Sequence, residues 1–186
     1  WGESEFHFLV PTSNFRTHCI YVARICDLWN MLKAKGLYKS YGDVQVLKGI
    51  DVDIKQAEVV SIVGASGAGK TTLLQILGTL DRPDKGSVSF DGRDLTKLSD
   101  KQMGLFRNES IGFIFQFHQL LPEFNALENV CIPGYIGKRP EAEVKERAKS
   151  LLQRLGLSHR LDHKPGALSG GEQQRVSIAR AFSNRP

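Results

Sequence analysis

Several features that mark common protein classes are scarce or missing in this chain of 186 residues. No stretch of 18 apolar residues occurs, which excludes a transmembrane helix. The three cysteines, Cys19, Cys26 and Cys131, form no C-x-x-C pair, and their odd number favours free thiols in a reducing compartment over a disulfide framework. The net charge is +5 without a run of five or more like charges, so nothing supports a nucleic-acid partner, although weak attraction to an anionic membrane surface remains compatible.

The first 30 residues lack the pattern of a signal peptide. The chain begins with Trp1, carries Glu3 and Glu5 where a signal peptide has Lys or Arg, and has its first methionine at Met31. The apolar run 19–23 has the length of a short strand or helix. We nevertheless expect residues 1–30 to be a non-native or disordered extension and residues 31–186 to hold the folded domain.

From residue 32 onward, turn residues separate apolar segments in the manner of an α/β domain. Residues 46–54 alternate apolar and polar side chains, which is typical of an antiparallel strand, whereas the β-branched run 59–63 suits a buried parallel strand. We expect strands at 32–38, 46–54, 59–63, 87–90 and 111–115, and helices at 70–80, 100–108, 140–155 and 171–182.

Two of the expected helices carry clear packing patterns. In 70–80 the apolar residues surround the helix, which predicts burial on most sides for Leu73, Leu74, Ile76, Leu77 and Leu80. In 140–155, Pro140 occupies the first turn, Gly156 follows the end, and Glu141 and Lys145 are spaced for an ion pair. One face of this second helix is apolar and holds Val144, Ala148, Leu151, Leu152 and Leu155.

A glycine-rich loop joins the strand at 59–63 to the helix at 70–80. It fits the pattern G-x-x-x-x-G-K-[ST] with Gly64, Ala65, Ser66, Gly67, Ala68, Gly69, Lys70 and Thr71. The glycines let successive backbone N–H groups form a nest for an anion, and the helix N-terminus adds positive partial charge. We expect Lys70 to reach the β- and γ-phosphates of a nucleoside triphosphate, Thr71 to offer its hydroxyl to Mg²⁺, and Thr72 to contact the α-phosphate.

A second glycine-containing motif, Leu168-Ser169-Gly170-Gly171-Glu172-Gln173, precedes the helix expected at 171–182. Ser169 stands at a helix start and the two glycines leave backbone N–H groups bare, which makes a second anion site. The same residues would also cap an ordinary helix.

With the phosphate loop upstream, this motif closely resembles the signature motif of ABC-transporter ATPases. The resemblance implies an α/β P-loop NTPase core with an antiparallel β subdomain and a helical insert, here at about 118–165. It assigns Ser169, Gly170, Gly171 and Gln173 to ATP binding.

The resemblance assigns two further residues. Gln116 follows the strand expected at 111–115, at the position of the family's Q-loop glutamine, which contacts Mg²⁺ and the attacking water and couples the nucleotide to the membrane subunit. Tyr41, in Lys39-Ser40-Tyr41-Gly42, matches the aromatic residue that stacks on adenine, although a tyrosine in a turn is also common in ordinary packing.

The segment from Phe115 to Val130 resembles the lipoprotein-releasing (LolD) group of ABC ATPases, whose sister groups are the macrolide-export (MacB-like) and cell-division (FtsE-like) ATPases. The resemblance implies a homodimer with ATP held between the phosphate loop of one copy and the signature helix of the other. It also implies a peripheral position on the cytoplasmic face of the bacterial inner membrane, against integral membrane permease subunits. On this resemblance, His118 belongs to the surface that meets those subunits.

The pattern of ABC ATPases continues beyond the signature helix with a strand ending in the Walker B aspartate, a catalytic glutamate and a switch histidine. The chain ends at Pro186. We therefore expect the domain to be incomplete at its C-terminus, with Lys70 and Gln116 as the catalytic residues that it carries. We expect the full-length protein to be an ABC-type ATPase and the fragment to be inactive alone, since the metal clamp and the base are missing.

Other functions stay open at this point. A soluble ABC ATPase of DNA repair or translation would show tandem cassettes, or a coiled-coil or zinc insert between the two motifs, and the sequence shows none. A P-loop kinase or GTPase needs no signature motif, so residues 168–173 argue against it. Macrolide-export-like or cell-division-like transport, and a fragment without enzymatic activity, are the remaining alternatives.

Overall fold

The computed structural model describes residues 7–9, 22–23, 32–56, 58–115 and 117–184. The chain forms two compact units. Unit 1 runs over Trp1–Cys19 and Asp27–Met103, and unit 2 over Ile20–Cys26 and Gly104–Pro186. The described residues do not include Gln116, Cys19 or Cys26. They also leave out most of the segment 1–30, so the status of this segment as an extension stays a prediction.

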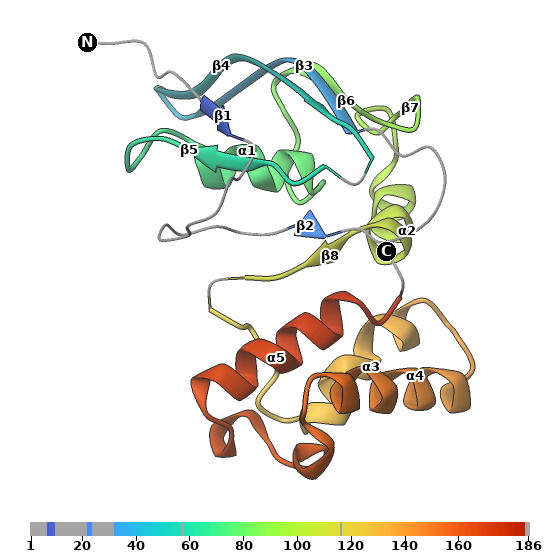
Figure 1. Cartoon of the computed structure of the whole chain (residues 1–186). Helices are drawn as coiled ribbons and strands as arrows, with labels where there is room; N and C mark the ends of the chain where they lie inside the picture. The colour runs from blue at the N-terminus through green and yellow to red at the C-terminus, as the bar shows by residue number, and fades with distance from the viewer. Residues whose placement is uncertain (1–6, 10–21, 24–31, 57, 116, 185–186) are drawn as a thin grey trace. The chain divides into compact units, whose positions relative to one another are not determined.

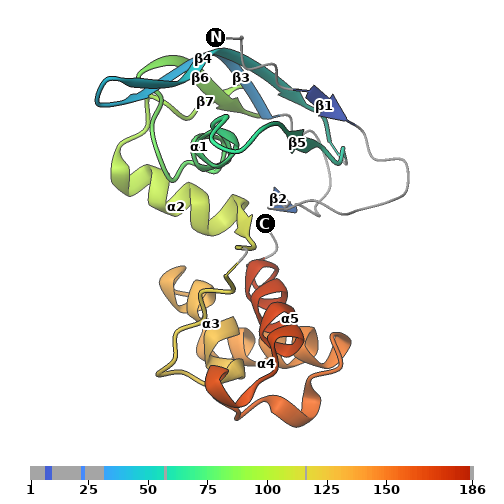
Figure 2. The same ribbon diagram turned by 90° about the vertical axis from the view of Figure 1, so that its left-hand side faces the viewer.

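Unit 1 is built on a four-stranded antiparallel sheet (Figure 1). Its order is β4 (Val44–Ile54), β3 (Leu32–Tyr41), β6 (Lys85–Phe90) and β7 (Arg93–Asp94). Helix α1 (Lys70–Leu77) lies along one face of this sheet in both views (Figure 2). The fully buried side chains between sheet and helix include Leu37, Leu47, Leu73, Ile76 and Val88.

Helix α1 is shorter than the predicted 70–80. It ends at Leu77, and Thr79 then takes a left-handed backbone conformation with φ of 60°. The N–H of Leu80 bonds to the carbonyl of Gln75 at 2.7 Å, and the Leu80 side chain is 44% exposed, which contradicts its predicted burial. The positive φ ends the helical repeat, so Leu80 leaves the apolar face that Leu73, Ile76 and Leu77 share.

The strand predicted at 59–63 also differs from expectation. The observed strand β5 covers Ser61–Val63 and pairs antiparallel with β1 (His7–Leu9), so the parallel prediction is wrong for this pairing. Residues 61–63 are half-buried, and the Val59 side chain is 52% exposed. A β-branched run sets strand propensity, but the partner, and hence the direction of pairing, comes from a distant segment.

Unit 2 is mainly helical. Helix α2 (Asp100–Ser110) ends in it, and β2 (Val22–Ala23) pairs antiparallel with β8 (Gly112–Phe113), which is shorter than the strand predicted at 111–115. Helices α3 (Ala126–Ile136), α4 (Glu141–Arg154) and α5 (Gly170–Ala181) follow, with 3₁₀ turns at Ser158–Arg160 and Pro165–Ala167.

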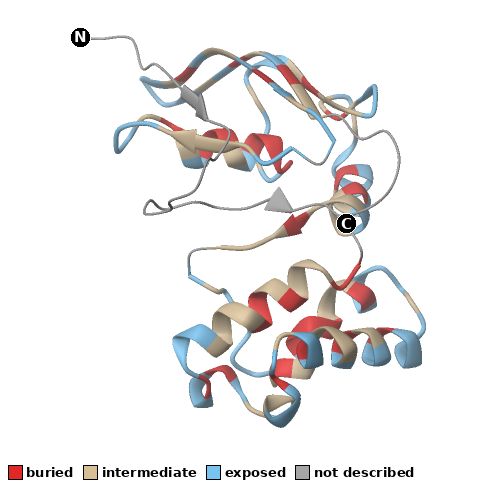
Figure 3. Cartoon of the chain, in the orientation of Figure 1, coloured by how far each residue is buried: buried red, intermediate tan, exposed pale blue. Residues whose placement is uncertain are grey.

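The three helices α3, α4 and α5 enclose the core of unit 2, where their buried positions meet (Figure 3). That core is formed by Ala126, Val130, Cys131, Val144, Ala148, Leu152, Leu157, Leu168, Val176 and Ala179. Helix α4 follows its prediction closely: it begins after Pro140, and Lys145 pairs with Glu141 at 2.6 Å. Among the described helices, none is long and apolar enough to cross a membrane.

Candidate ATP-binding site

The glycine-rich loop lies where the sequence places it, between β5 and α1 in unit 1. Gly69 is the N-cap of α1 with φ of 91°. A Cβ atom there would stand 2.7 Å from Val46 Cγ1 and 3.1 Å from Leu47 Cδ2 on β4. Both the backbone conformation and the contact require glycine, so β4 fixes the position at which the loop becomes a helix.

The start of α1 presents backbone donors. The first helical hydrogen bond runs from the N–H of Leu73 to the carbonyl of Gly69 at 2.9 Å. The N–H groups of Lys70, Thr71 and Thr72 therefore have no acceptor within the helix and point out of its N-terminal end. Together with the positive end of the helix dipole, they suit an anion.

Lys70 is folded back over the loop. Its Nζ donates hydrogen bonds to the carbonyls of Gly64 at 2.8 Å and Ala65 at 2.6 Å. An ammonium has three donors, so a third N–H can meet a phosphate oxygen while these two bonds persist. The loop backbone thus holds the ammonium within the glycine-rich loop that leads into α1.

The predicted adenine-stacking residue lies in the same unit. Tyr41 ends β3, its ring is half-exposed, its hydroxyl donates to Asp81 Oδ2 at 2.7 Å, and the side chain of Thr72 lies near that hydroxyl. Thr72 belongs to the first turn of α1. The structure therefore brings Tyr41 next to the phosphate loop, while the Thr72 hydroxyl faces Tyr41, and its contact with an α-phosphate stays a prediction.

The signature motif forms the start of α5 in unit 2. Ser169 is the N-cap, and a capping box joins it to Glu172: the N–H of Ser169 donates to Glu172 Oε2 at 2.7 Å, and the N–H of Glu172 donates to Ser169 Oγ at 3.4 Å. These bonds from the Ser169 backbone and hydroxyl, with the ion pair to Arg160, lower the pKa of Glu172 to about 2. Gly170 and Gly171 are exposed, so their N–H groups remain accessible to an anion.

Gln173 is used locally. Its Nε2 donates to the carbonyls of Pro165 at 3.0 Å and Leu168 at 3.1 Å, which braces the turn that precedes α5. The role of Gln173 in ATP binding stays a prediction.

Gln116 lies outside the described residues, but the segment that follows it is held by α5. Arg180 donates from Nη1 to the carbonyl of Gln119 at 2.7 Å and from Nη2 to the carbonyl of His118 at 2.9 Å. Burial lowers the pKa of the Arg180 guanidinium. The sequence motifs assign no role to this arginine.

Asn129 is a second residue that the motifs did not single out. It is fully buried in α3, accepts a hydrogen bond from the N–H of Leu121 at 2.8 Å, and donates to the carbonyls of Leu121, Phe124 and Asn125 at 3.1, 3.0 and 3.0 Å. It therefore fixes the loop that precedes α3. The sequence offered little signal for this role, because Asn129 follows the polar Glu128 and directly precedes the apolar segment that begins at Val130.

Exposed apolar side chains occur in this loop and at the far end of α3. Phe117 is 79% exposed, and Leu121, Phe124, Tyr135 and Ile136 are each more than 40% exposed. Three of them, Phe117, Leu121 and Phe124, belong to one short loop, and exposed apolar side chains close in sequence favour a partner surface.

Comparisons with known proteins agree on one family. The family model described as ABC transporter matches residues 47–186. The lipoprotein-releasing system ATP-binding protein LolD of Bacteroides thetaiotaomicron is 58% identical over 156 residues, covering 84% of this chain and 72% of that protein. LolD of Cytophaga hutchinsonii is 60% identical, covering 84% of this chain and 71% of that protein.

Solved structures confirm the predicted fold class. The dimeric structure of MJ0796, a bacterial ABC transporter cassette, matches with a TM-score of 0.74 and 38% identity over 83% of this chain and 70% of that one. A post-hydrolysis dimer of MJ0796 bound to ADP and Pi matches equally well. With a phosphate loop at the start of α1, a signature motif at the start of α5 and these relatives, the chain belongs to the ABC transporter family.

Proposed function

We propose that this chain is the ATP-binding subunit of an ABC transporter that couples ATP binding and hydrolysis to the release or export of lipoproteins from the bacterial inner membrane. The observation that carries the proposal is the 58–60% identity to LolD proteins over 84% of the chain. The geometry supports its ATP-binding part, because α1 begins with N–H groups that lack a helical acceptor and the Lys70 ammonium is held by the loop that leads into this helix.

Mg²⁺ fits the side chains at this site. Thr71 is exposed in the first turn of α1 and offers a hydroxyl oxygen, the hard ligand that Mg²⁺ prefers. The described residues contain no cluster of three His, Cys, Asp or Glu side chains that would hold a metal by themselves. Thr71 and Gln116 would hold the ion, which would neutralise charge on the β- and γ-phosphates.

The chain works as a homodimer in this proposal. Lys70 and the N–H groups of α1 bind the phosphates of one ATP, while Ser169, Gly170 and Gly171 of the second copy face the same γ-phosphate. Two weakly positive helix starts then close on one anion. The dimeric state of the related cassette MJ0796 supports this arrangement.

The membrane permease docks, in this proposal, on the exposed apolar residues around Phe117, Leu121 and Phe124. Arg180 holds the backbone beside Phe117, and Asn129 holds the loop that carries Leu121 and Phe124. Such docking places the subunit peripherally on the cytoplasmic face of the inner membrane.

The test is a reconstitution of the full-length protein with its membrane subunits and a lipoprotein in liposomes. We expect ATP to release the lipoprotein to a soluble acceptor, and we expect Lys70→Ala to abolish this release. Export of a macrolide without lipoprotein release, or co-purification with division proteins alone, would show that the cargo proposal is wrong.

A further inference from the structure

Tyr41 is held by a charged pair in unit 1. Its hydroxyl donates to Asp81 Oδ2 at 2.7 Å, and the Lys39 ammonium donates to Asp81 Oδ1 at 2.9 Å. Each oxygen of the carboxylate therefore has its own donor, one from each of two residues of β3. The Asp81 side chain is 29% exposed and the Lys39 side chain 12%, so both charges are partly shielded from water.

The ring of Tyr41 is also restrained on its face. The Nζ atom of Lys39 stands 5.3 Å above the ring centroid, in the range of a cation–π contact. The side chain of Thr72, on α1, lies near the Tyr41 hydroxyl. One face of the ring lies under the ammonium and the hydroxyl is bonded to Asp81, while Tyr41 is 48% exposed, so ring surface remains for a flat ligand.

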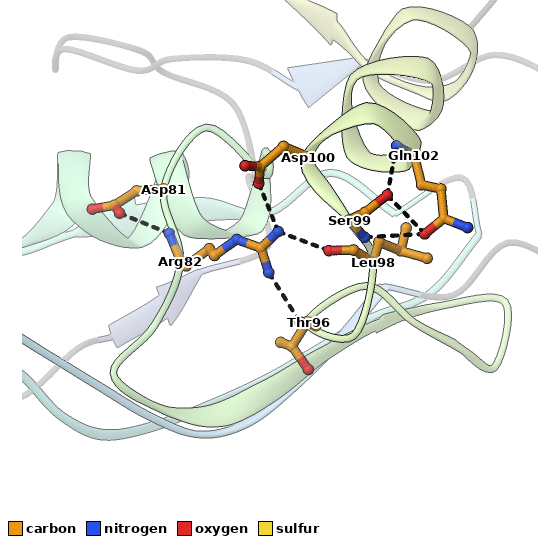
Figure 4. Close-up of polar contacts among 7 residues, drawn as sticks. All are labelled: Asp81, Arg82, Thr96, Leu98, Ser99, Asp100 and Gln102. Carbon is orange, nitrogen blue, oxygen red and sulfur yellow. Dashed lines mark hydrogen bonds and ion pairs between the residues drawn. The ribbon is translucent and has the colours of Figure 1, made fainter.

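Asp81 is itself anchored at the end of the α1 region. The N–H of Arg82 donates to Asp81 Oδ1 at 2.7 Å, and Lys39 donates to the Arg82 carbonyl at 2.7 Å. The Arg82 guanidinium bonds to the carbonyls of Thr96 and Leu98 at 3.1 and 2.7 Å and to Asp100 at 2.9 Å (Figure 4). The acceptor of the Tyr41 hydroxyl therefore has a fixed position before any ligand binds.

The protonation states suit this arrangement. Burial opposes ionisation of Asp81, but the hydrogen bonds from Tyr41 and Lys39 lower its pKa overall, so it is a carboxylate at neutral pH. The hydrogen bond to Asp81, with burial, raises the pKa of Tyr41, which remains a phenol. The donor and acceptor thus keep their roles throughout the physiological range.

We propose that Asp81 is a positioning residue for the nucleotide base: it fixes the Tyr41 ring in the orientation in which the base stacks. The proposal rests on the proposed ATP-binding function and on the predicted stacking of Tyr41 on adenine. A side chain ordered before binding loses less conformational freedom on binding, so preorganisation raises affinity for the part of the ligand that the ring contacts.

The test separates base binding from phosphate binding. Isothermal titration measures the Kd values of MgATP and of inorganic triphosphate with Mg²⁺, for the wild type and for Asp81→Asn, Tyr41→Phe and Tyr41→Ala. We expect Asp81→Asn and Tyr41→Phe each to weaken MgATP by about three- to tenfold, the usual effect of one hydrogen bond, and to leave triphosphate unchanged. Combining the two substitutions should add no further loss, because both remove the same bond.

Asp84→Asn is the matched control. Asp84 lies 3.8 Å from the Lys39 ammonium and accepts a hydrogen bond from the N–H of Ser40 at 2.7 Å. It shares the charge environment of Asp81, whereas the recorded acceptor of the Tyr41 hydroxyl is Asp81. We expect Asp84→Asn to bind MgATP with the affinity of the wild type.

The possible outcomes separate two failures. If Tyr41→Ala binds MgATP like the wild type, the predicted stacking of Tyr41 on adenine is wrong. If Tyr41→Ala weakens MgATP binding but Asp81→Asn and Tyr41→Phe do not, the ring stacks on the base without needing the bond to Asp81. The positioning role of Asp81 is then wrong. Loss of triphosphate binding in Asp81→Asn would mean that the substitution damages the phosphate loop. That result would also overturn the positioning role of Asp81. Tyr41→Phe provides the answer if Asp81→Asn does not fold.

Discussion

Replacing Asn129 with alanine should loosen the loop that we propose as part of the permease surface. The Asn129 side chain is fully buried and joins α3 to the backbone of Leu121, Phe124 and Asn125 through one accepted and three donated hydrogen bonds. Alanine keeps the helix, because its helix propensity is high, and removes all of these bonds. The substitution therefore weakens the attachment of the loop and leaves the helix intact.

The magnitude follows from the number of hydrogen atoms available. The amide has two N–H groups for its three carbonyl acceptors, so one hydrogen is shared, and the side chain contributes the equivalent of three bonds. At about 1 kcal/mol each, Asn129→Ala should lower the free energy of unfolding by about 3 kcal/mol. Rehydration of the exposed Leu121 backbone reduces this loss to no less than about 2 kcal/mol.

Urea unfolding gives the free energy, and hydrogen exchange of the Leu121 amide reports the loop directly. Asn125→Ala is the control, since it removes only the α3 cap, in which the N–H of Glu128 donates to Asn125 Oδ1 at 2.8 Å, and should cost about 1 kcal/mol. The reasoning fails if Asn129→Ala costs no more than Asn125→Ala, or if exchange at Leu121 stays as slow as in the wild type.

Two further predictions concern packing and pH. Gly134→Ala should destabilise unit 2 by about 1–3 kcal/mol relative to Gly104→Ala, because a Cβ at Gly134 would stand 2.6 Å from Val144 Cγ2, whereas Gly104 has open space around it. Gly104→Ala should itself stabilise the protein by about 0.5–1 kcal/mol. Equal changes in the free energy of unfolding for the two variants, measured in urea, would contradict the close packing of Gly134 against Val144. The pKa of Glu172 falls from 4.5 to about 2 on folding, so its ionised form stabilises the protein above about pH 4.5 and this stabilisation is lost as the pH falls toward 2. The difference in Tm between wild type and Glu172→Gln should shrink below pH 4.5, and a constant difference would contradict the capping-box geometry.

Local signals were sufficient where a few neighbouring residues decide the structure. Ser169 and Glu172 form the capping box that their spacing predicts, and α4 begins after Pro140 with its apolar face buried. The phosphate loop meets the start of α1 as expected. In each case the interacting groups lie within one helical turn or one loop.

Long-range contacts decided what the sequence left open. Helix α3 contains Pro133 in a nearly continuous apolar run, which hides the helical period. The carbonyl of Pro133 accepts hydrogen bonds from the side chains of Asn108 at 2.9 Å and Asn184 at 3.0 Å, both distant in sequence. The partner of β5 and the contact between Tyr41 and Asp81 are likewise set by distant segments.

The affinity of the protein for MgATP, compared between the wild type and Lys70→Ala, tests the central claim most directly. The Lys70 ammonium donates to the carbonyls of Gly64 and Ala65, in the loop that leads to the N–H groups that would receive the phosphates. We predict that Lys70→Ala weakens MgATP binding by about tenfold or more, the effect of losing a charged hydrogen bond. Equal affinities for the two proteins would contradict the assignment of this loop as the phosphate site.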